Sequence, residues 1–153
     1  MGDDVIISIR SDQDMVVARA EVRRLANSLG FSRTDTTLIA TAVSEIARNI
    51  LVHAKCGEIS MMPLRGEDRY GLVVVARDSG PGIRDVSRVV ESGFASKGGL
   101  GLGLPGARRL MDEFEVKSEP GDGTTVTMTK WRNRDDLERL REHRFRRANG
   151  PSP

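Results

Sequence analysis

Two glycine-rich turns, separated by a short polar segment, constrain this chain more than any other feature. The first reads Asp-Ser-Gly-Pro-Gly over residues 78–82, and the second reads Gly-Gly-Leu-Gly-Leu-Gly over residues 98–103. Glycine permits positive φ and lets the backbone approach a ligand closely, while backbone N–H groups at a helix start attract phosphate. The two turns therefore predict the two ends of a nucleotide pocket.

Neither turn matches a common nucleotide-binding motif. The second turn leads into a helical period, yet no Gly-Lys-Ser or Gly-Lys-Thr follows it, and it does not sit in an early strand–turn–helix unit. Taken singly, the first turn is also compatible with a tight bend in which Asp78 caps its own backbone. Other polar residues and their structural context must therefore decide what the two turns do.

Apolar residues along the chain predict the helices and strands of an α+β protein. Residues 12–29, about 32–53 and 104–114 repeat apolar side chains with a helical period. Short apolar or alternating runs predict one strand followed by two hairpins, at 5–9, 58–64, 70–77, 114–118 and 124–131. We expect a two-layer sandwich with the helices on one face of a mixed, mostly antiparallel sheet.

The bulk composition fits one domain in a reducing compartment. A chain of 153 residues, 38% hydrophobic and 30% charged, has room for one ordinary core. No apolar run approaches the ~18 residues of a membrane span, and residues 1–4 lack the basic and apolar regions of a signal peptide. Cys56 is the single cysteine and has no partner for a disulfide within the chain. We therefore expect a cytoplasmic protein.

The body and the tail of the chain differ in charge. Residues 1–130 are close to neutral, whereas residues 131–153 carry an excess of basic side chains. Acidic residues are mixed into that tail. The sequence shows neither a recognition helix for DNA nor a cluster of aromatic side chains that could stack on bases, which argues against nucleic acid or a membrane as a partner. We expect a globular domain over residues 1–132 and a basic, partly helical or disordered extension over 133–153.

One expected helix carries polar residues beside its apolar stripe. Glu45 and Asn49 are four residues apart, so they project from the same side of the helix. A carboxylate and an amide in this arrangement can orient a hydroxyl and hold a hard cation. The pair is also typical of a plain surface contact, and His53, one turn further, is more typical of a cap than of a metal ligand.

Four short motifs occur in an order that resembles the GHKL superfamily of ATPases and kinases. They are Glu45-x-x-x-Asn49, Asp78-x-Gly80-x-Gly82, Gly99-x-Gly101-x-Gly103 and Gly123-Thr124. The resemblance implies the Bergerat form of the α+β sandwich and a pocket for ATP and Mg2+. Glu45 would be the general base or the carboxylate that orients water, Asn49 the Mg2+ ligand and Asp78 the acceptor for the adenine amino group.

The same resemblance implies roles for the glycine-rich turns. Gly80 and Gly82 would shape the adenine end, and residues 84–98 would form a lid over ATP. Lys97 in that lid would either reach a terminal phosphate or remain solvated. The other implied ATP contacts come from the second turn and the last motif, namely Gly99, Gly101, Leu102, Gly103 and Thr124.

Chain length and local sequence narrow the branch of the superfamily. Sensor histidine kinases need a second helical module, and the gyrase, chaperone and mismatch-repair branches need large transducing domains. Leu-Pro-Gly at 104–106 and Arg-Leu-Met-Asp-Glu-Phe at 109–114 resemble the small switch kinases of the stressosome. That resemblance, over about residues 5–132, implies serine/threonine phosphorylation of STAS-domain antagonist or scaffold proteins, followed by activation of a PP2C-type phosphatase.

Two other functions remain open on the sequence. The anti-sigma kinases share the four motifs, so the chain is alternatively an anti-sigma factor that sequesters a sigma subunit. A nucleotide-gated binding module without catalysis is the second alternative, and the retention of Glu45 and Asn49 argues against it. The STAS substrate, the downstream output as a sigma factor or a second messenger, and the formation of a homodimer are also open.

Overall fold

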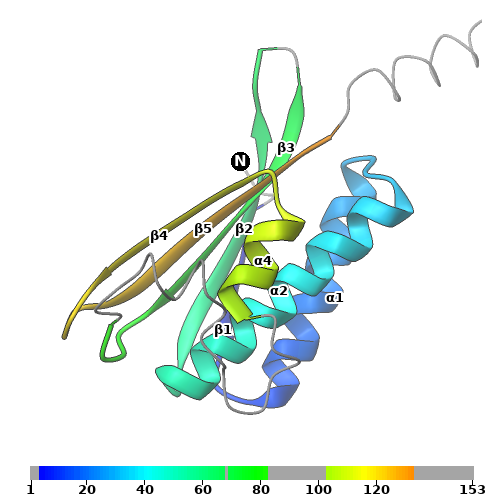
Figure 1. The fold of residues 1–153 in the computed structure, drawn as a ribbon. Helices are drawn as coiled ribbons and strands as arrows, with labels where there is room; N and C mark the ends of the chain where they lie inside the picture. Colours follow the sequence, from blue (N-terminus) through cyan, green and yellow to red (C-terminus); the bar gives the residue numbers. More distant parts are fainter. Residues whose placement is uncertain (1–3, 68, 83–102, 133–153) are drawn as a thin grey trace, which may run out of the picture.

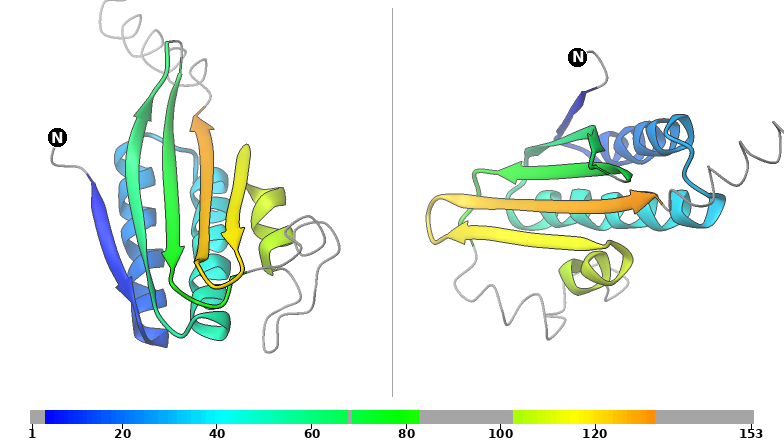
Figure 2. Two further views of the ribbon diagram at one scale, coloured as in Figure 1. Left: turned by 90° about the vertical axis from the view of Figure 1, so that its left-hand side faces the viewer. Right: turned by 90° about the horizontal axis from the view of Figure 1, so that it is seen from above.

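The computed structural model describes residues 4–67, 69–82 and 103–132, which form a two-layer α+β sandwich (Figure 1). One layer is a five-stranded sheet, and the described helices all cover the same face of it (Figure 2). The expected fold class is therefore confirmed. Residues 133–153 lie outside the described part, so the domain boundary at 132 stays a prediction. Within the described ranges, no helix is long and apolar enough to cross a membrane.

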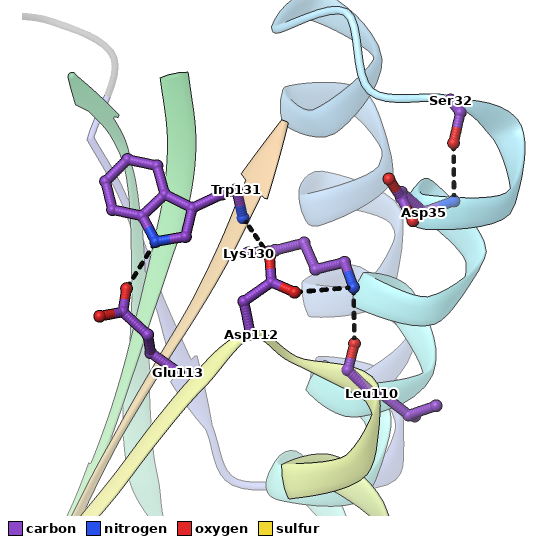
Figure 3. Close-up of polar contacts among 7 residues, drawn as sticks. All are labelled: Ser32, Asp35, Leu110, Asp112, Glu113, Lys130 and Trp131. Atoms are coloured by element: carbon purple, nitrogen blue, oxygen red, sulfur yellow. Dashed lines mark hydrogen bonds and ion pairs between the residues drawn. The ribbon is translucent and has the colours of Figure 1, made fainter. Parts of the chain in front are cut away.

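Two long helices each combine a polar N-cap with an apolar stripe. α1 (Asp12–Ser28) begins after Ser11, whose hydroxyl accepts a backbone N–H from the first turn at 3.4 Å. α2 (Arg33–His53) begins after Ser32, whose hydroxyl accepts the N–H of Asp35 at 3.0 Å (Figure 3). Because α2 contacts both α1 and the shorter α4, it is the central helix of its layer.

Every described strand pairing in the sheet is antiparallel, in the order β1-β2-β3-β5-β4. The sequence predicted a mixed, mostly antiparallel sheet, and no parallel pairing occurs among the described strands. β5 lies between β3 and β4, so the two expected hairpins are joined side by side. The strands are β1 (Val5–Ile9), β2 (Gly57–Arg65), β3 (Tyr70–Asp78), β4 (Glu113–Glu119) and β5 (Gly123–Arg132).

The core lies between the two layers because strand side chains alternate between the faces of the sheet. On β3, Leu72, Val74 and Ala76 are buried, whereas Val73 and Val75 are half-buried on the face without helices. The helix layer supplies the other half of the core, including from α2 the buried Ile39, Val43, Ile46 and Ile50. The stripe predicted for this helix is therefore confirmed as its core face.

The third helix is shorter than its sequence pattern indicates. We expected a helix over 104–114, but α4 spans Gly103–Leu110, and β4 follows after two residues. Lys130 Nζ donates to the last carbonyl of α4 at 3.1 Å, and Asp112 Oδ2 accepts the backbone N–H of Trp131 at 2.7 Å (Figure 3). These bonds to β5 turn the chain into the sheet, so tertiary contacts override the helical periodicity.

Candidate functional site

Four register partners form a row across one end of the sheet. Gly57 pairs with Asp78, Asp78 with Thr124, and Thr124 with Ser118. Directly paired residues of antiparallel strands project to the same face, with Cβ atoms about 5 Å apart. Thr124 is buried, and the strand alternation places this row on the face that the helices cover. The row, which we call the end row, joins the second and fourth motifs in space.

Asp78 is held at the end of β3 by its own turn. Its Oδ1 accepts the N–H of Gly80 at 2.9 Å, so the carboxylate caps the turn, as the structural alternative predicted. Among the described residues, none donates a hydrogen bond to Oδ2. Asp78 therefore closes the turn with one oxygen only, so the structural interpretation does not exclude the functional one.

Glycines let the end of α2 pack directly against the end row. A Cβ added to Gly80 would lie 2.6 Å from the Cβ of Ala54, and one added to Gly57 would lie 2.9 Å from Cγ2 of Ile50. Both distances are below normal van der Waals contact, so larger side chains would push α2 away from the sheet. Asn49 lies five residues before Ala54, a helical rise of about 7.5 Å, so the first motif approaches the second.

The first glycine-rich turn also packs against the turn between β4 and β5. Gly82 and Gly123 have φ of +79° and +84°, the left-handed region that glycine adopts without strain. A Cβ on Gly82 would overlap the carbonyl of Glu119, and the N–H of Gly121 donates to the carbonyl of Pro81 at 2.8 Å. Backbone atoms of the first glycine-rich turn and of the β4–β5 turn therefore lie close to the end row.

Glu45 and Asn49 lie on α2, where the sequence placed them. Glu45 is only 6% exposed and Asn49 is half-buried, whereas His53 is exposed. A carboxylate is rarely so buried, which sets Glu45 apart from an ordinary surface residue. Within the described ranges, no group of three or more His, Cys, Asp or Glu side chains is arranged to hold a metal ion. Mg2+ commonly binds one or two side-chain oxygens together with substrate phosphates, and Asn49 fits that pattern.

The second glycine-rich turn is described only at its end. Gly103 begins α4, and the first N–H groups of a helix have no partner within the helix, so they suit a phosphate. α4 contacts α2, the helix that carries the first motif. Lys97, Gly99, Gly101 and Leu102 lie outside the described residues together with the expected lid, and their roles stay predictions.

Ser118 joins the site only through the structure. Its hydroxyl lies 2.8 Å from Oγ1 of Thr124 and donates to the carbonyl of Gly123 at 3.0 Å. No sequence motif marks it. Its inward position could have been recognised from the alternation with Phe114 and Val116, in a hairpin strand that faces the fourth motif.

A hollow of about 470 Å3 lies at the same end of the sheet on the uncovered face. Ser8, Glu58, Arg77 and Thr125 line it, and they are register neighbours that alternate with the inward-facing residues. Gly57 and Asp78 of the end row also line it, so the hollow reaches the end row at this end of the sheet.

Comparisons with known proteins show which family the chain resembles. Residues 9–130 match the family model described as histidine kinase-like ATPase domain. The chain is 44% identical over 131 residues to the serine/threonine-protein kinase RsbT of Bacillus subtilis, covering 86% of this chain and 98% of that protein. It is 32% identical over 133 residues to the anti-sigma F factor of Caldanaerobacter subterraneus subsp. tengcongensis, covering 83% and 92%.

Two solved structures share the fold at low sequence identity. The RsbU and RsbW domains of Rv1364c from Mycobacterium tuberculosis superpose with a TM-score of 0.58 at 21% identity, covering 85% of this chain and 33% of that one. The SiaB–SiaC complex from Pseudomonas aeruginosa gives a TM-score of 0.50 at 13% identity, covering 83% and 89%. With the family model matched over most of its length, the chain belongs to the histidine kinase-like ATPase domain family.

Proposed function

We propose that this chain is an ATP-dependent serine/threonine protein kinase of a partner-switching module. In this proposal it phosphorylates STAS-domain antagonist or scaffold proteins in the cytoplasm and, once released from them, activates a PP2C-type phosphatase. The observation that carries the proposal is the 44% identity to a serine/threonine-protein kinase along 98% of that protein's length. The buried carboxylate on the central helix supports it, because phosphoryl transfer needs a group that orients the acceptor.

Glu45 orients and deprotonates the acceptor hydroxyl in this scheme. The hydroxyl oxygen bonds to the γ-phosphorus of ATP while the bond from that phosphorus to the bridging oxygen breaks, so ADP leaves and the proton passes to Glu45. Burial of Glu45 limits competition from water for the acceptor. Asn49, one turn further along α2, would hold Mg2+, which neutralises phosphate charge when it is bound.

The remaining motif residues bind the nucleotide in the same scheme. Asp78 accepts from the adenine amino group through its second carboxylate oxygen, and Thr124 lies next to it in the end row. Gly80 and Gly82 bring the backbone close to the base, as their contacts with α2 and the β4–β5 turn support. Gly103 and the turn before it bind the phosphates through backbone N–H groups.

The test is phosphotransfer from labelled ATP, with Mg2+, to purified STAS-domain proteins from the same organism. We expect Glu45→Ala to lower the transfer rate by about 10²- to 10⁴-fold while ATP affinity stays within about threefold of the wild type. Glu58→Ala is the matched control, because Glu58 is an exposed carboxylate on the uncovered face. Unchanged transfer by Glu45→Ala would remove the role of this residue. ATP binding without transfer by the wild type would favour the non-catalytic binding module.

A second candidate function is that of an anti-sigma kinase. The 32% identity to an anti-sigma F factor over 92% of its length favours it. Affinity purification of the tagged chain, with identification of the bound proteins, separates the two candidates. We expect STAS-domain proteins and a PP2C-type phosphatase, whereas recovery of a sigma factor without them would replace the proposed function by this one.

A further inference from the structure

We propose that Ser118 is a positioning residue that makes the pocket selective for adenine over guanine, acting through Thr124. The inference rests on the proposed function, because it takes the end row as the place where the base of ATP binds. Ser118 lies on β4, one strand beyond Thr124, and none of the four motifs includes it.

The hydrogen bonds of Ser118 determine the direction of the Thr124 hydroxyl. A serine hydroxyl has one proton and two lone pairs, whereas a carbonyl oxygen can only accept. Ser118 Oγ lies 3.0 Å from the carbonyl oxygen of Gly123, so that bond uses the serine proton. Either hydroxyl could donate in the 2.8 Å contact between Ser118 Oγ and Thr124 Oγ1, but only donation by Thr124 lets this bond and the bond to Gly123 form together. Thr124 is left with lone pairs only.

Asp78 is the neighbour of Thr124 in the end row and is also an acceptor. Its Oδ1 accepts the N–H of Gly80 at 2.9 Å. Two hydrogen-bond acceptors therefore lie on adjacent strands, at directly paired positions. Adenine presents an amino group, with two N–H donors, at the position where guanine presents a carbonyl oxygen. The adenine amino group can donate to both Asp78 and Thr124. The carbonyl oxygen of guanine would instead face two other acceptors, which is costly in a buried site.

Loss of the Ser118 hydroxyl would remove this constraint. The Thr124 hydroxyl would then rotate and donate to a guanine carbonyl, so discrimination would fall even though Thr124 and Asp78 remain. Gly57, at the other end of the row, has no side chain that could substitute for Ser118. Selectivity for the base thus depends on a residue that need not touch it.

The test is the ratio of the dissociation constants for GTP and ATP, measured by calorimetry on the full chain with Mg2+. We expect Ser118→Ala to lower this ratio about tenfold, and Ser118→Thr, which restores a hydroxyl, to retain it. Ser60→Ala is the control, because this half-buried serine on β2 lies outside the end row. In a Thr124→Val background, Ser118→Ala should change the ratio less than about twofold, because its effect passes through Thr124.

The outcomes separate this inference from the proposed function. A wild-type protein that binds neither nucleotide would overturn both. ATP-selective binding with an unchanged ratio in Ser118→Ala, or equal weakening of ATP and GTP, would overturn the inference alone. Circular dichroism of each variant shows that the folded protein is compared. If Ser118→Ala does not fold, Ser118→Cys takes its place with the same expected fall in the ratio, because a thiol is only a weak hydrogen-bond donor.

Discussion

Strands β3 and β5 run together through the sheet, and their two ends are built in opposite ways. At one end Asp78 pairs with Thr124, next to glycines whose missing side chains let backbone segments meet. At the other end Tyr70 pairs with Arg132, whose guanidinium carbon lies 4.9 Å from the centre of the tyrosine ring. At one end glycines let backbone segments meet, whereas at the other large side chains pack together and Gly71 leaves room for the ring of Trp131.

The end with large side chains ties several elements together. Arg69 stacks over the ring of Trp131 at 3.9 Å. The indole N–H of Trp131 donates to Glu113 at 2.6 Å (Figure 3). Arg132 donates to the carbonyl of Leu29, just after α1, at 2.6 Å. These contacts fill the space and stabilise the fold. The end with glycines instead holds the polar groups that we propose bind the nucleotide, so substitutions at the two ends should separate stability from binding.

The largest effect is expected for Gly123→Ala at the glycine end. A Cβ there would overlap the backbone of Asp78 at a φ of +84°, so we expect the free energy of unfolding to fall by about 3 kcal/mol. Gly121→Ala is the matched control, because its φ is +89° but nothing lies within 4 Å of the added Cβ. We expect about 1 kcal/mol for it in urea denaturation. Equal losses would show that the close approach is unimportant.

Asp78→Asn should separate binding from stability at the same end. The amide oxygen can still accept the N–H of Gly80, so we expect the free energy of unfolding to change by less than about 1 kcal/mol. The charge and one acceptor are lost, so ATP affinity should fall by about 50-fold in calorimetry. A large loss of stability with normal affinity would assign Asp78 to the turn alone.

Trp131→Ala should produce the converse result at the other end. It removes the stack with Arg69 and the bond to Glu113, so we expect the free energy of unfolding to fall by about 2 kcal/mol. ATP affinity should stay within about twofold of the wild type. A weakened affinity at constant stability would contradict the division between the two ends.

The smallest effect is expected in the helix layer, away from the strand ends. Ser32→Ala removes the N-cap of α2 and should lower the free energy of unfolding by about 1 kcal/mol. Thr37→Ala is the control, because this exposed hydroxyl only bonds back to the carbonyl of Arg33 within the helix. We expect a change below about 0.5 kcal/mol in the same denaturation experiment. A larger loss for Thr37→Ala would argue against the cap as the cause.

Most of the fold followed from patterns that act over a few residues. Helical periodicity predicted the ends of both long helices to within one residue. The apolar and alternating runs predicted the ends of each strand to within one residue. The pattern over 104–114 was misleading because its last residues also alternate as a strand. Only the bonds from Lys130 and Trp131 decided that α4 ends at Leu110.

The sequence by itself determined which residue types the proposed site has and in what order, because glycines, carboxylates and amides at short spacing express local chemistry. Only the tertiary structure decided which of them meet. Asp78 and Thr124 are 46 residues apart in the sequence but are direct partners in the sheet. Such a pairing depends on strand register, which exists only once the strands have assembled. The same register places Ser118 beside Thr124, a contact that no local pattern specifies because hydrogen bonds between strands depend on which strands pair.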